Sequence, residues 1–325
     1  MMIRIVKNSI KRVLTSIKWR FIPNGVYCFN YHRIGDSRNA QYDSDIYSCD
    51  NDTFLSHIRF YKNNFKLIST KDLEHLIKTG EVINSRFALI TFDDGYIDNY
   101  SNAYKILRNE KVPATFYVPT SYIGSAITPW WDEIAWMIRN TLHDSVKIGQ
   151  WKSPVPIQQN NIDASIRAVL LEVKKTYKMS MDDILIQLRK AMECQLEVSQ
   201  EALFMSWDHL REMQAHGMRI GSHTHSHEIL SHVGIDSQYL ELKKSKEILE
   251  KELNDTISTF AYPVGRSDTY TKETIQALKS CGYTHAFTQL LGVNKRPNKN
   301  CFELRRFPVD GNIKADMIPQ LVCLN

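Results

Sequence analysis

The sequence alternates between short apolar runs and longer amphipathic stretches, and this alternation restricts the possible folds more than any other feature. The apolar runs cover residues 26–31, 87–92, 114–118, 218–221, 257–262, 284–288 and 303–307. Helical spacing of apolar residues occurs at about 51–64, 70–79, 99–110, 206–216, 236–253 and 271–281. Strands that alternate with helices form parallel sheets or barrels. We therefore expect an α/β fold, as one barrel-like domain.

A long segment in the middle of the chain interrupts this alternation. Residues from about 125 to 204 begin with Pro129-Trp130-Trp131-Asp132-Glu133 and contain helical patterns near 131–141, 162–177 and 180–195. We interpret the segment as a mainly helical insertion that either shapes a substrate groove or forms an interface. Its tryptophans, which include Trp136, either stack on sugar rings or form the core of the insertion.

Charge and cysteine content argue against several classes of protein. The formal net charge of +5 is modest and no nucleic-acid-binding module accompanies it, so we expect no nucleic-acid partner. The six cysteines lack a Cys-x-x-Cys pair, which is typical of free thiols in a reducing compartment. No run reaches the ~18 apolar residues of a membrane-spanning helix, and basic residues interrupt the apolar runs near the N-terminus. We therefore expect a cytoplasmic protein.

The N-terminal segment, residues 1–22, is basic and amphipathic. Its first twenty residues contain six Lys or Arg side chains and no acid, and apolar residues recur at helical spacing. Such a helix can lie on an anionic membrane surface, here the inner face of the membrane. The alternative is a helix packed on the body of the protein. The sequence leaves both alternatives open.

Polar residues follow several of the expected strands. In parallel barrels the C-terminal strand ends build the active site, so these residues indicate one composite site. The pair Asp93-Asp94, followed by Gly95, is costly unless a positive group lies beside it, and a divalent metal would supply that charge. One carboxylate would bind the metal while the other takes a proton from water. Taken alone, the motif also suits a plain turn.

A histidine cluster follows the strand expected at 218–221. His223 and His227 are four residues apart, so one helical turn would direct both imidazoles at one ion, with Ser222 or Thr224 as its cap. His225 would point elsewhere. Two histidines and one aspartate leave positions open for water and substrate, which is typical of a catalytic metal site. A single histidine here would more often be structural.

Three further motifs carry weaker signals. His32 is either a general acid that faces the metal or a hydrogen-bonded histidine at a strand end. Tyr262 and Pro263 either form a groove wall with a backbone N–H directed at an oxyanion or end a strand in a turn. Arg306 either points inward, where its charge would keep Asp93 ionised and oriented, or is solvated.

These motifs together resemble those of the polysaccharide deacetylases, carbohydrate esterase family 4. Thr91-Phe92-Asp93-Asp94-Gly95 matches the first family motif, and the histidine cluster matches the His-Ser/Thr-x-x-His motif about 130 residues later. Residues 260–265 resemble the third motif of a branch that includes the poly-N-acetylglucosamine deacetylases. The resemblance covers most of the chain, and the insertion is the part that it covers least.

The resemblance implies an irregular (β/α)7 barrel over residues 23–325 and assigns a role to each motif. Asp93 would be the general base. In the branch with an N-terminal Tyr-His motif, His32 would be the general acid, since the C-terminal Leu-x-x-His of other members is absent. The third motif lacks the Arg of many members, so Arg306 would partner Asp93. The ligands of a divalent metal, with Zn²⁺ expected, would be Asp94, His223 and His227.

The expected function is removal of an N-acetyl group from an amino sugar in a surface-polysaccharide or glycan-precursor pathway. The substrate would be an N-acetylated sugar or glycan, with lipid-linked and nucleotide-linked sugars as candidates. The alternatives are hydrolysis of another C–N bond, in a formamide or a cyclic amide, and a non-catalytic carbohydrate-binding protein on the same barrel.

Overall fold

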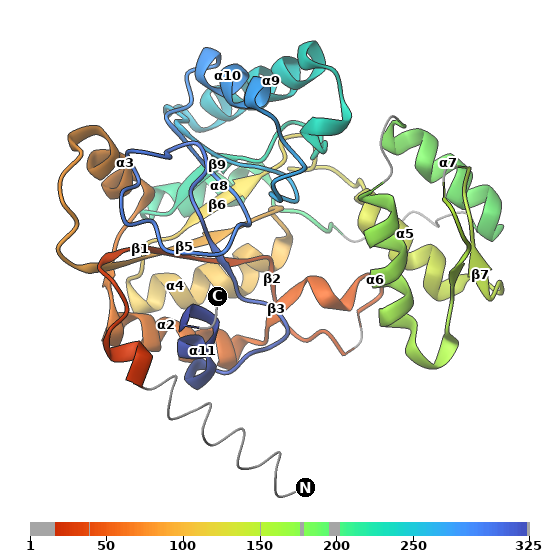
Figure 1. Ribbon diagram of the computed structural model, residues 1–325, viewed down its shortest axis with the longest axis horizontal. Coiled ribbons are helices and arrows are strands. Elements are labelled where there is room, and N and C mark those ends of the chain that lie inside the picture. Colours follow the sequence, from red (N-terminus) through yellow and green to blue (C-terminus); the bar gives the residue numbers. More distant parts are fainter. Residues whose placement is uncertain (1–16, 39, 150, 176–178, 195–201, 324–325) are drawn as a thin grey trace, which may run out of the picture.

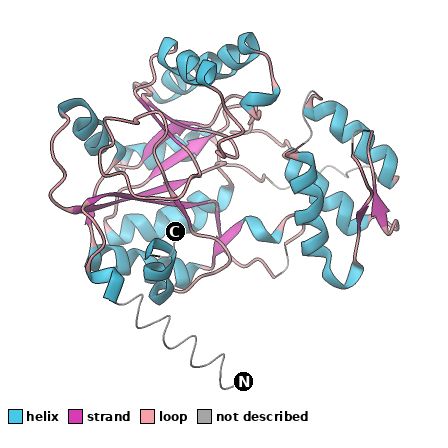
Figure 2. Ribbon diagram, in the orientation of Figure 1, coloured by secondary structure: helices cyan, strands magenta, loops and turns pink. Residues whose placement is uncertain are grey.

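The computed structural model describes residues 17–38, 40–149, 151–175, 179–194 and 202–323. Its main body is an eight-stranded parallel sheet surrounded by helices, and a helical lobe stands to one side (Figures 1 and 2). Within the described residues, no helix has the length and apolar character needed to cross a membrane. The strands of the sheet are β1 (Gly25–Tyr31), β4 (Lys66–Leu67), β5 (Arg86–Phe92), β6 (Thr115–Val118), β9 (Arg219–Ser222), β10 (Thr259–Ala261), β11 (His285–Phe287) and β12 (Phe307–Pro308).

The sheet is closed by the segment near its last strand. The strand order is β11-β10-β9-β6-β5-β1-β12, and β4 pairs with the first part of β5. Leu304 forms a parallel bridge with Phe287 of β11, and Phe307 pairs with Phe29 of β1. Residues 304–308, here called the closing segment, therefore lie between β11 and β1. The expected (β/α)7 barrel is confirmed, although the strand expected at 303–307 is regular only in β12.

The helices around the barrel lie close to the expected ranges because their ends are capped. Asp50 accepts a hydrogen bond from Thr53 N–H at the start of α2, and Ser69 forms a capping box with Asp72 at the start of α3. The expected helix at 99–110 begins instead as a π-helix, η2 (Asn99–Tyr104). The α-helices of the barrel are α2 (Asn51–Asn64), α3 (Thr70–Thr79), α4 (Lys105–Glu110), α8 (Trp207–Ala215), α9 (Ile235–Leu253), α10 (Lys272–Ser280) and α11 (Ile318–Cys323).

The insertion forms the separate lobe at the right of Figure 1. It is mainly helical, as expected, and it also contains a short antiparallel β-ribbon that the sequence analysis missed. Its buried side chains form a hydrophobic cluster distinct from that of the barrel. The insertion therefore has a core of its own. Its elements are α5 (Trp130–Asn140), β7 (Ser145–Val146), β8 (Val155–Pro156), η3 (Gln159–Asn161), α6 (Ile162–Val173) and α7 (Met181–Met192).

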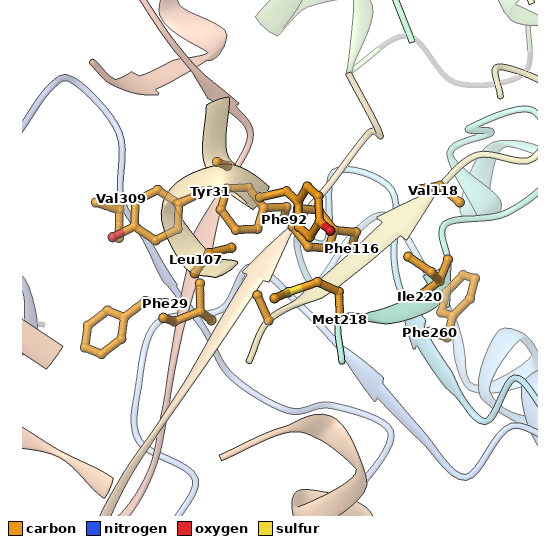
Figure 3. Packing of buried hydrophobic residues seen from close by; sticks show 14 of the residues in the cluster. Phe29, Tyr31, Phe92, Leu107, Phe116, Val118, Met218, Ile220, Phe260 and Val309 are labelled. Atoms are coloured by element: carbon orange, nitrogen blue, oxygen red, sulfur yellow. The ribbon is translucent and has the colours of Figure 1, made fainter. Parts of the chain in front are cut away.

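Side chains on one face of the strands pack outward against the helices. The labelled residues in Figure 3 belong to this cluster, and most of them come from alternate strand positions. Phe92 stacks between Tyr31 and Phe116, with ring centroids 5.4 and 4.7 Å away. These aromatic contacts connect three adjacent strands, which fixes the register of the strands that end at the site.

Side chains on the other face point into the barrel. The apolar part of this interior includes Val26, Cys28, Leu89, Tyr117 and Phe287. Two residues further along a strand the side chain returns to the same face, so Asn30 follows Cys28 and Thr91 follows Leu89. Thr91 Oγ1 donates to Asn30 Oδ1 over 2.7 Å. The interior therefore changes from apolar to polar towards the carboxyl ends of the strands.

Most of the basic N-terminal segment lies outside the described residues, which begin at residue 17. In the part that is described, the Trp19 ring lies 5.6 Å from Phe60 and 5.7 Å from Phe65 at the end of α2. Ile17 and Phe21 are exposed. The end of the segment is therefore packed on the barrel through Trp19.

Candidate metal centre and active site

The carboxyl ends of β5 and β9 bring three metal-binding side chains together. Asp94 Oδ1 lies 3.5 Å from His223 Nε2 and 3.3 Å from His227 Nε2, and all three residues are buried. Two atoms that each bind one zinc ion at ~2.0–2.1 Å in tetrahedral geometry lie roughly 3.3 Å apart. The spacing of the three predicted ligands therefore fits a single metal ion.

The surroundings of the two imidazoles favour the form that binds a metal. His223 Nδ1 lies 2.7 Å from the carbonyl oxygen of Ala261, which only accepts, so we assign the proton to Nδ1 and a lone pair to Nε2. Burial lowers the pKa of His227 despite the nearby Asp94 carboxylate. A neutral ring is the state that coordinates a metal.

The loop that carries the histidines is not a helical turn, so this part of the sequence prediction is wrong. Thr224 and His227 have φ values of 66° and 59°, in the left-handed region, and no helix forms between them. Ser222 bonds to a serine of α9 instead of capping a helix. His225 points away, as expected, and its Nδ1 bonds to Thr120 Oγ1. A reversal of the loop, and not helical spacing, makes the two imidazoles converge.

A carboxylate of α9 holds this histidine loop in place. Glu241 Oε2 accepts hydrogen bonds from the backbone N–H groups of His225 and Ser226 at 2.9 and 2.8 Å, and Oε1 accepts from Ser226 Oγ. One side chain thus satisfies two consecutive N–H groups of the loop. Glu241 was not singled out from the sequence.

Asp93 is held by a dense set of donors beside the metal centre. The Arg306 guanidinium donates to both carboxylate oxygens, at 2.8 and 2.7 Å, and is fully buried. Asn30 and Gln289 donate to Oδ2 at 3.1 and 3.2 Å. Burial raises the pKa of Asp93, but the charge of Arg306 and the hydrogen bonds that it donates outweigh burial, so the pKa lies below its usual value. Asp93 is therefore an ionised carboxylate, and Arg306 points inward.

His32 faces the same space from the end of β1. Its Nδ1 lies 3.8 Å from Asp310 Oδ1, and Asn99 of the π-helix donates to its carbonyl oxygen over 2.7 Å. Burial lowers the pKa of His32, but Asp310 and the charges of Asp94 and Asp93 outweigh it and raise the pKa to about 9. His32 therefore carries a proton at neutral pH.

The role expected for the Tyr262 backbone is wrong. The Tyr262 N–H donates to the carbonyl oxygen of Phe287 at 3.0 Å, so this donor is engaged between β10 and β11. The Tyr262 ring stacks on Tyr270, with centroids 4.2 Å apart. Neither Tyr262 nor Pro263 is among the described residues that line the site cavity. The two residues form a structural strand end.

Val264, two residues later, faces the cavity instead. Its φ of 61° is rare for a β-branched residue, and the Gly265 N–H donates to the Pro263 carbonyl oxygen across it. No described residue accepts a hydrogen bond from the Val264 N–H. A strained turn thus leaves one backbone donor free beside the site.

The site residues line a cavity of about 380 Å³, here called the catalytic cavity. This volume is in the range typical of ligand-binding pockets. One wall comes from the insertion, through Trp130, Trp131, Leu170 and Lys174. The insertion therefore shapes the groove, which was one of the two expected alternatives. The two tryptophans are 6% and 5% exposed, so they belong mainly to the core of the insertion.

Several residues of the site were missed in the sequence. Asn30 had a usable signal, because it lies two residues after the inward-facing Cys28 on the same strand. Gln289 and Lys174 are single polar residues without a motif. Val264 contributes through its backbone, which a side-chain pattern does not report. Asp310 follows the closing segment, whose geometry depends on pairing with residues far away in the chain.

Comparison with known proteins identifies the family. The family model for polysaccharide deacetylases matches residues 82–150 and 159–286, more than half of the chain. The chain belongs to the polysaccharide deacetylase family. The matched ranges of this polysaccharide deacetylase contain the three candidate metal ligands and Asp93, whereas His32 and Arg306 lie outside them.

Two curated relatives show how far the similarity extends. The Bacillus subtilis (strain 168) protein YxkH is 21% identical over 257 residues, which cover 79% of this chain and 63% of that protein. The poly-beta-1,6-N-acetyl-D-glucosamine N-deacetylase of Staphylococcus aureus (strain MSSA476) is 27% identical over 145 residues, which cover 42% of this chain and 49% of that protein. The chain thus spans less than two thirds of the length of these relatives. The resemblance to the poly-N-acetylglucosamine branch is confirmed.

Two solved structures confirm the fold. The Streptococcus pyogenes deacetylase PplD, in complex with acetate, superposes with a TM-score of 0.60 at 20% identity and covers 93% of this chain and 99% of its own. IcaB from Ammonifex degensii superposes with a TM-score of 0.56 at 17% identity, covering 92% and 96% of the two chains. The barrel with its insertion is therefore matched over nearly the whole length of the chain.

Proposed function

We propose that this protein is a metal-dependent N-deacetylase that removes acetyl groups from the amino sugars of a glycan. The observation that carries the proposal is the arrangement of one cavity. It contains a metal-binding group of Asp94, His223 and His227, an ionised Asp93 beside it, and a protonated His32. The S. aureus relative, named for N-deacetylation of poly-beta-1,6-N-acetyl-D-glucosamine, supports the choice of substrate class.

Each residue of the cavity has a distinct task in this proposal. A divalent ion held by Asp94, His223 and His227, which we expect to be Zn²⁺, would lower the pKa of water and polarise the amide carbonyl. Asp93 accepts the proton of the attacking water, and Arg306 keeps its carboxylate ionised and oriented. The Val264 N–H donates to the carbonyl oxygen as negative charge develops there, in place of the Tyr262 N–H. Protonated His32 donates to the nitrogen of the leaving amine.

The protonation states of Asp93 and His32 support their proposed roles as base and acid. Asp93 and His32 line the same cavity, yet their pKa values are shifted in opposite directions. A base with a lowered pKa and an acid with a raised pKa are both in the required state at neutral pH. Two groups whose environments separate their pKa values in this way are typical of an acid–base pair.

Acetate release tests the proposal. The purified protein is incubated with free, lipid-linked, nucleotide-linked and polymeric N-acetyl sugars, with and without a chelator, and acetate and formate are measured. We expect acetate release that the chelator abolishes and added Zn²⁺ restores. Formate release or ring opening of a cyclic amide would identify another C–N hydrolase. Bound metal without any turnover would favour a carbohydrate-binding protein.

The cellular location belongs to the same proposal. We infer a cytoplasmic protein that acts at the inner face of the membrane on glycan precursors for the cell surface. The basic, amphipathic character of residues 1–20 supports this location. The scattered cysteines, which are all free among the described residues, are compatible with a reducing compartment.

A further inference from the structure

A second cavity adjoins the catalytic cavity and has no task in the function proposed above. Its volume is about 420 Å³, and it lies where the loop before α5, the start of α7 and the histidine loop meet. Trp130 and His227 line both cavities, so the two spaces share a wall. A ligand in the second cavity would therefore lie directly beside the metal centre.

The second cavity offers free hydrogen-bonding groups. The side-chain oxygens of Ser121, Thr128, Asp182 and Glu228 have no hydrogen-bond or ion-pair partner among the described residues. Trp130 and several aliphatic and methionine side chains supply apolar surface next to them. Polar and apolar residues contribute about equally to the lining. Hydrogen-bonding groups beside an aromatic ring and aliphatic side chains are typical of sites that bind small polar molecules such as sugars.

The charge of the second cavity restricts the ligand further. Asp182 and Glu228 contribute two carboxyl groups, and no described lysine or arginine lines the cavity. Burial raises the pKa of Glu228 to about 7, so the Asp182 carboxylate is the main negative charge. The cavity thus offers no cation to pair with a uronic acid or a phosphorylated sugar, which the Asp182 charge would repel. Sugar hydroxyl groups, in contrast, can donate hydrogen bonds to both carboxyl groups.

We propose that the second cavity is a subsite for the uncharged sugar residue next to the one that loses its acetyl group. The inference rests on the proposed N-deacetylase function and deepens it. Because α7 and Trp130 belong to the insertion, the insertion extends the binding site along the glycan chain. The enzyme should therefore discriminate between a single sugar and an oligomer.

Variants that fill or empty the cavity test this role. Ile127 is 46% exposed and lines the second cavity but not the catalytic cavity. Because the side chain is partly exposed, Ile127→Trp fills the space at little cost to folding. Asp182→Ala removes an exposed carboxylate without a partner. Ile186, which is 57% exposed on α7 and lines neither cavity, provides the matched control Ile186→Trp. The substrates are a β-1,6-linked tetramer of N-acetylglucosamine and its methyl monoglycoside, with acetate release measured for both.

We expect the wild-type protein to have a higher kcat/KM for the tetramer than for the monoglycoside. Ile127→Trp should lower kcat/KM for the tetramer about tenfold and leave the monoglycoside within about twofold, and Asp182→Ala should act in the same direction. Ile186→Trp should change neither. An equal loss on both substrates, or an unchanged rate on the tetramer, would overturn the subsite. If the wild-type protein released acetate neither from these two substrates nor from the wider panel of N-acetyl sugars, the N-deacetylase function itself would be overturned.

Discussion

Backbone conformation at single residues contributes to the site as much as side-chain identity does. Asp94, Thr224, His227 and Val264 have φ values of 75°, 66°, 59° and 61°. Such left-handed conformations cost on the order of 1–3 kcal/mol each and persist only where the surrounding structure enforces them. Two of these residues are proposed metal ligands and one presents a free backbone donor, so the strained conformations occur where side chains and N–H groups point into the site.

At the residue scale, the first prediction concerns the base. Asp93→Asn should lower kcat by about 10²–10⁴-fold, because the amide cannot accept the proton from water. The bound metal, measured by elemental analysis of the purified protein, should remain near one ion per chain, since Asp93 is not among the three proposed ligands. Near-normal turnover of this variant would contradict the assignment of the base. Its unfolding midpoint should be measured as well, because the variant leaves the buried Arg306 charge unpaired.

The second prediction concerns the acid. A general acid works only while it is protonated, so activity is present below the pKa of His32 and is lost as the pH rises through it. The Asp310 carboxylate helps to raise the pKa of His32 to about 9. Asp310→Asn should therefore lower that pKa and move the alkaline limb of the kcat/KM profile to lower pH. An alkaline limb that does not move would show that another group is the acid.

At the scale of elements, α9 positions the histidine loop, and this leads to the third prediction. Glu241→Gln replaces two hydrogen bonds from backbone N–H groups to a carboxylate with weaker bonds to an amide. Metal affinity, measured by competition with a chromogenic chelator, should fall about 10–100-fold, as for other groups that support metal ligands. Glu247→Gln on the exposed face of the same helix is the control and should leave metal affinity unchanged.

The attachment of the insertion gives the fourth prediction. Asp132 of α5 is fully buried and accepts a hydrogen bond of 2.6 Å from Tyr96 OH, which itself accepts from Trp131 Nε1. Burial raises the pKa of Asp132 to about 7. A carboxyl group with a raised folded-state pKa contributes stability that is present below its unfolded pKa and is lost as the pH rises through about 7.

Asp132→Asn removes this titration while keeping the shape of the side chain. Compared with the variant, the wild-type protein should therefore lose free energy of unfolding as the pH rises from about 4 towards 7, and the difference should level off above 7. Urea unfolding at several pH values measures the difference. Asp208→Asn, at a carboxylate that is 89% exposed, serves as the control and should follow the wild-type protein.

The sequence predicted regular elements better than irregular ones. The ranges of α2 and α3 agree because capping residues and apolar periodicity both mark their ends. The loop at 223–227 was assigned the wrong geometry, since the spacing of two histidines does not reveal that Thr224 is left-handed. The closing segment was poorly predicted for a different reason. Its conformation depends on pairing with β11 and β1, and neither partner is adjacent in the sequence.

The residues of the site were also predicted well where they follow regular strands and poorly where they depend on irregular segments. Asp94, His223 and His227 were predicted as a group, because each follows a strand whose carboxyl end faces the same mouth of the barrel. The inward position of Arg306 was one of two open alternatives. The Tyr262 N–H, expected as an oxyanion donor, is engaged by Phe287, and the sequence could not show this because it depends on the pairing of β10 with β11.

At the scale of the whole molecule, the barrel and the insertion have separate cores and share the catalytic cavity. The barrel supplies the groups proposed for chemistry, and the insertion supplies a wall. Arg139 of α5 donates to the carbonyl oxygen of Tyr42, and Arg167 of α6 pairs with Asp45. The insertion is therefore also attached to the segment that contains Tyr42 and Asp45. Substrate selection can therefore change through the insertion while the metal centre stays intact.

The fifth prediction concerns the N-terminal segment. Deletion of residues 1–20 should reduce co-sedimentation with vesicles that contain anionic lipid, because six positive charges and an apolar face are lost. Vesicles of neutral lipid should bind both proteins equally weakly. Deacetylation of a soluble substrate should be unchanged, since no described residue of the deleted segment lines the catalytic cavity. Unchanged co-sedimentation would contradict a membrane-binding role for residues 1–20.

The closing segment has a consequence for the timing of activity. Arg306 and Asp93 are 213 positions apart, and the salt bridge between them joins the last strand of the barrel to its middle. During synthesis, Asp93 and the histidine loop leave the ribosome well before the guanidinium that orients the carboxylate. A nascent chain, or one cut short before Arg306, would thus lack an oriented base even with every proposed metal ligand present, so the proposed hydrolysis could begin only after the closing segment has been made.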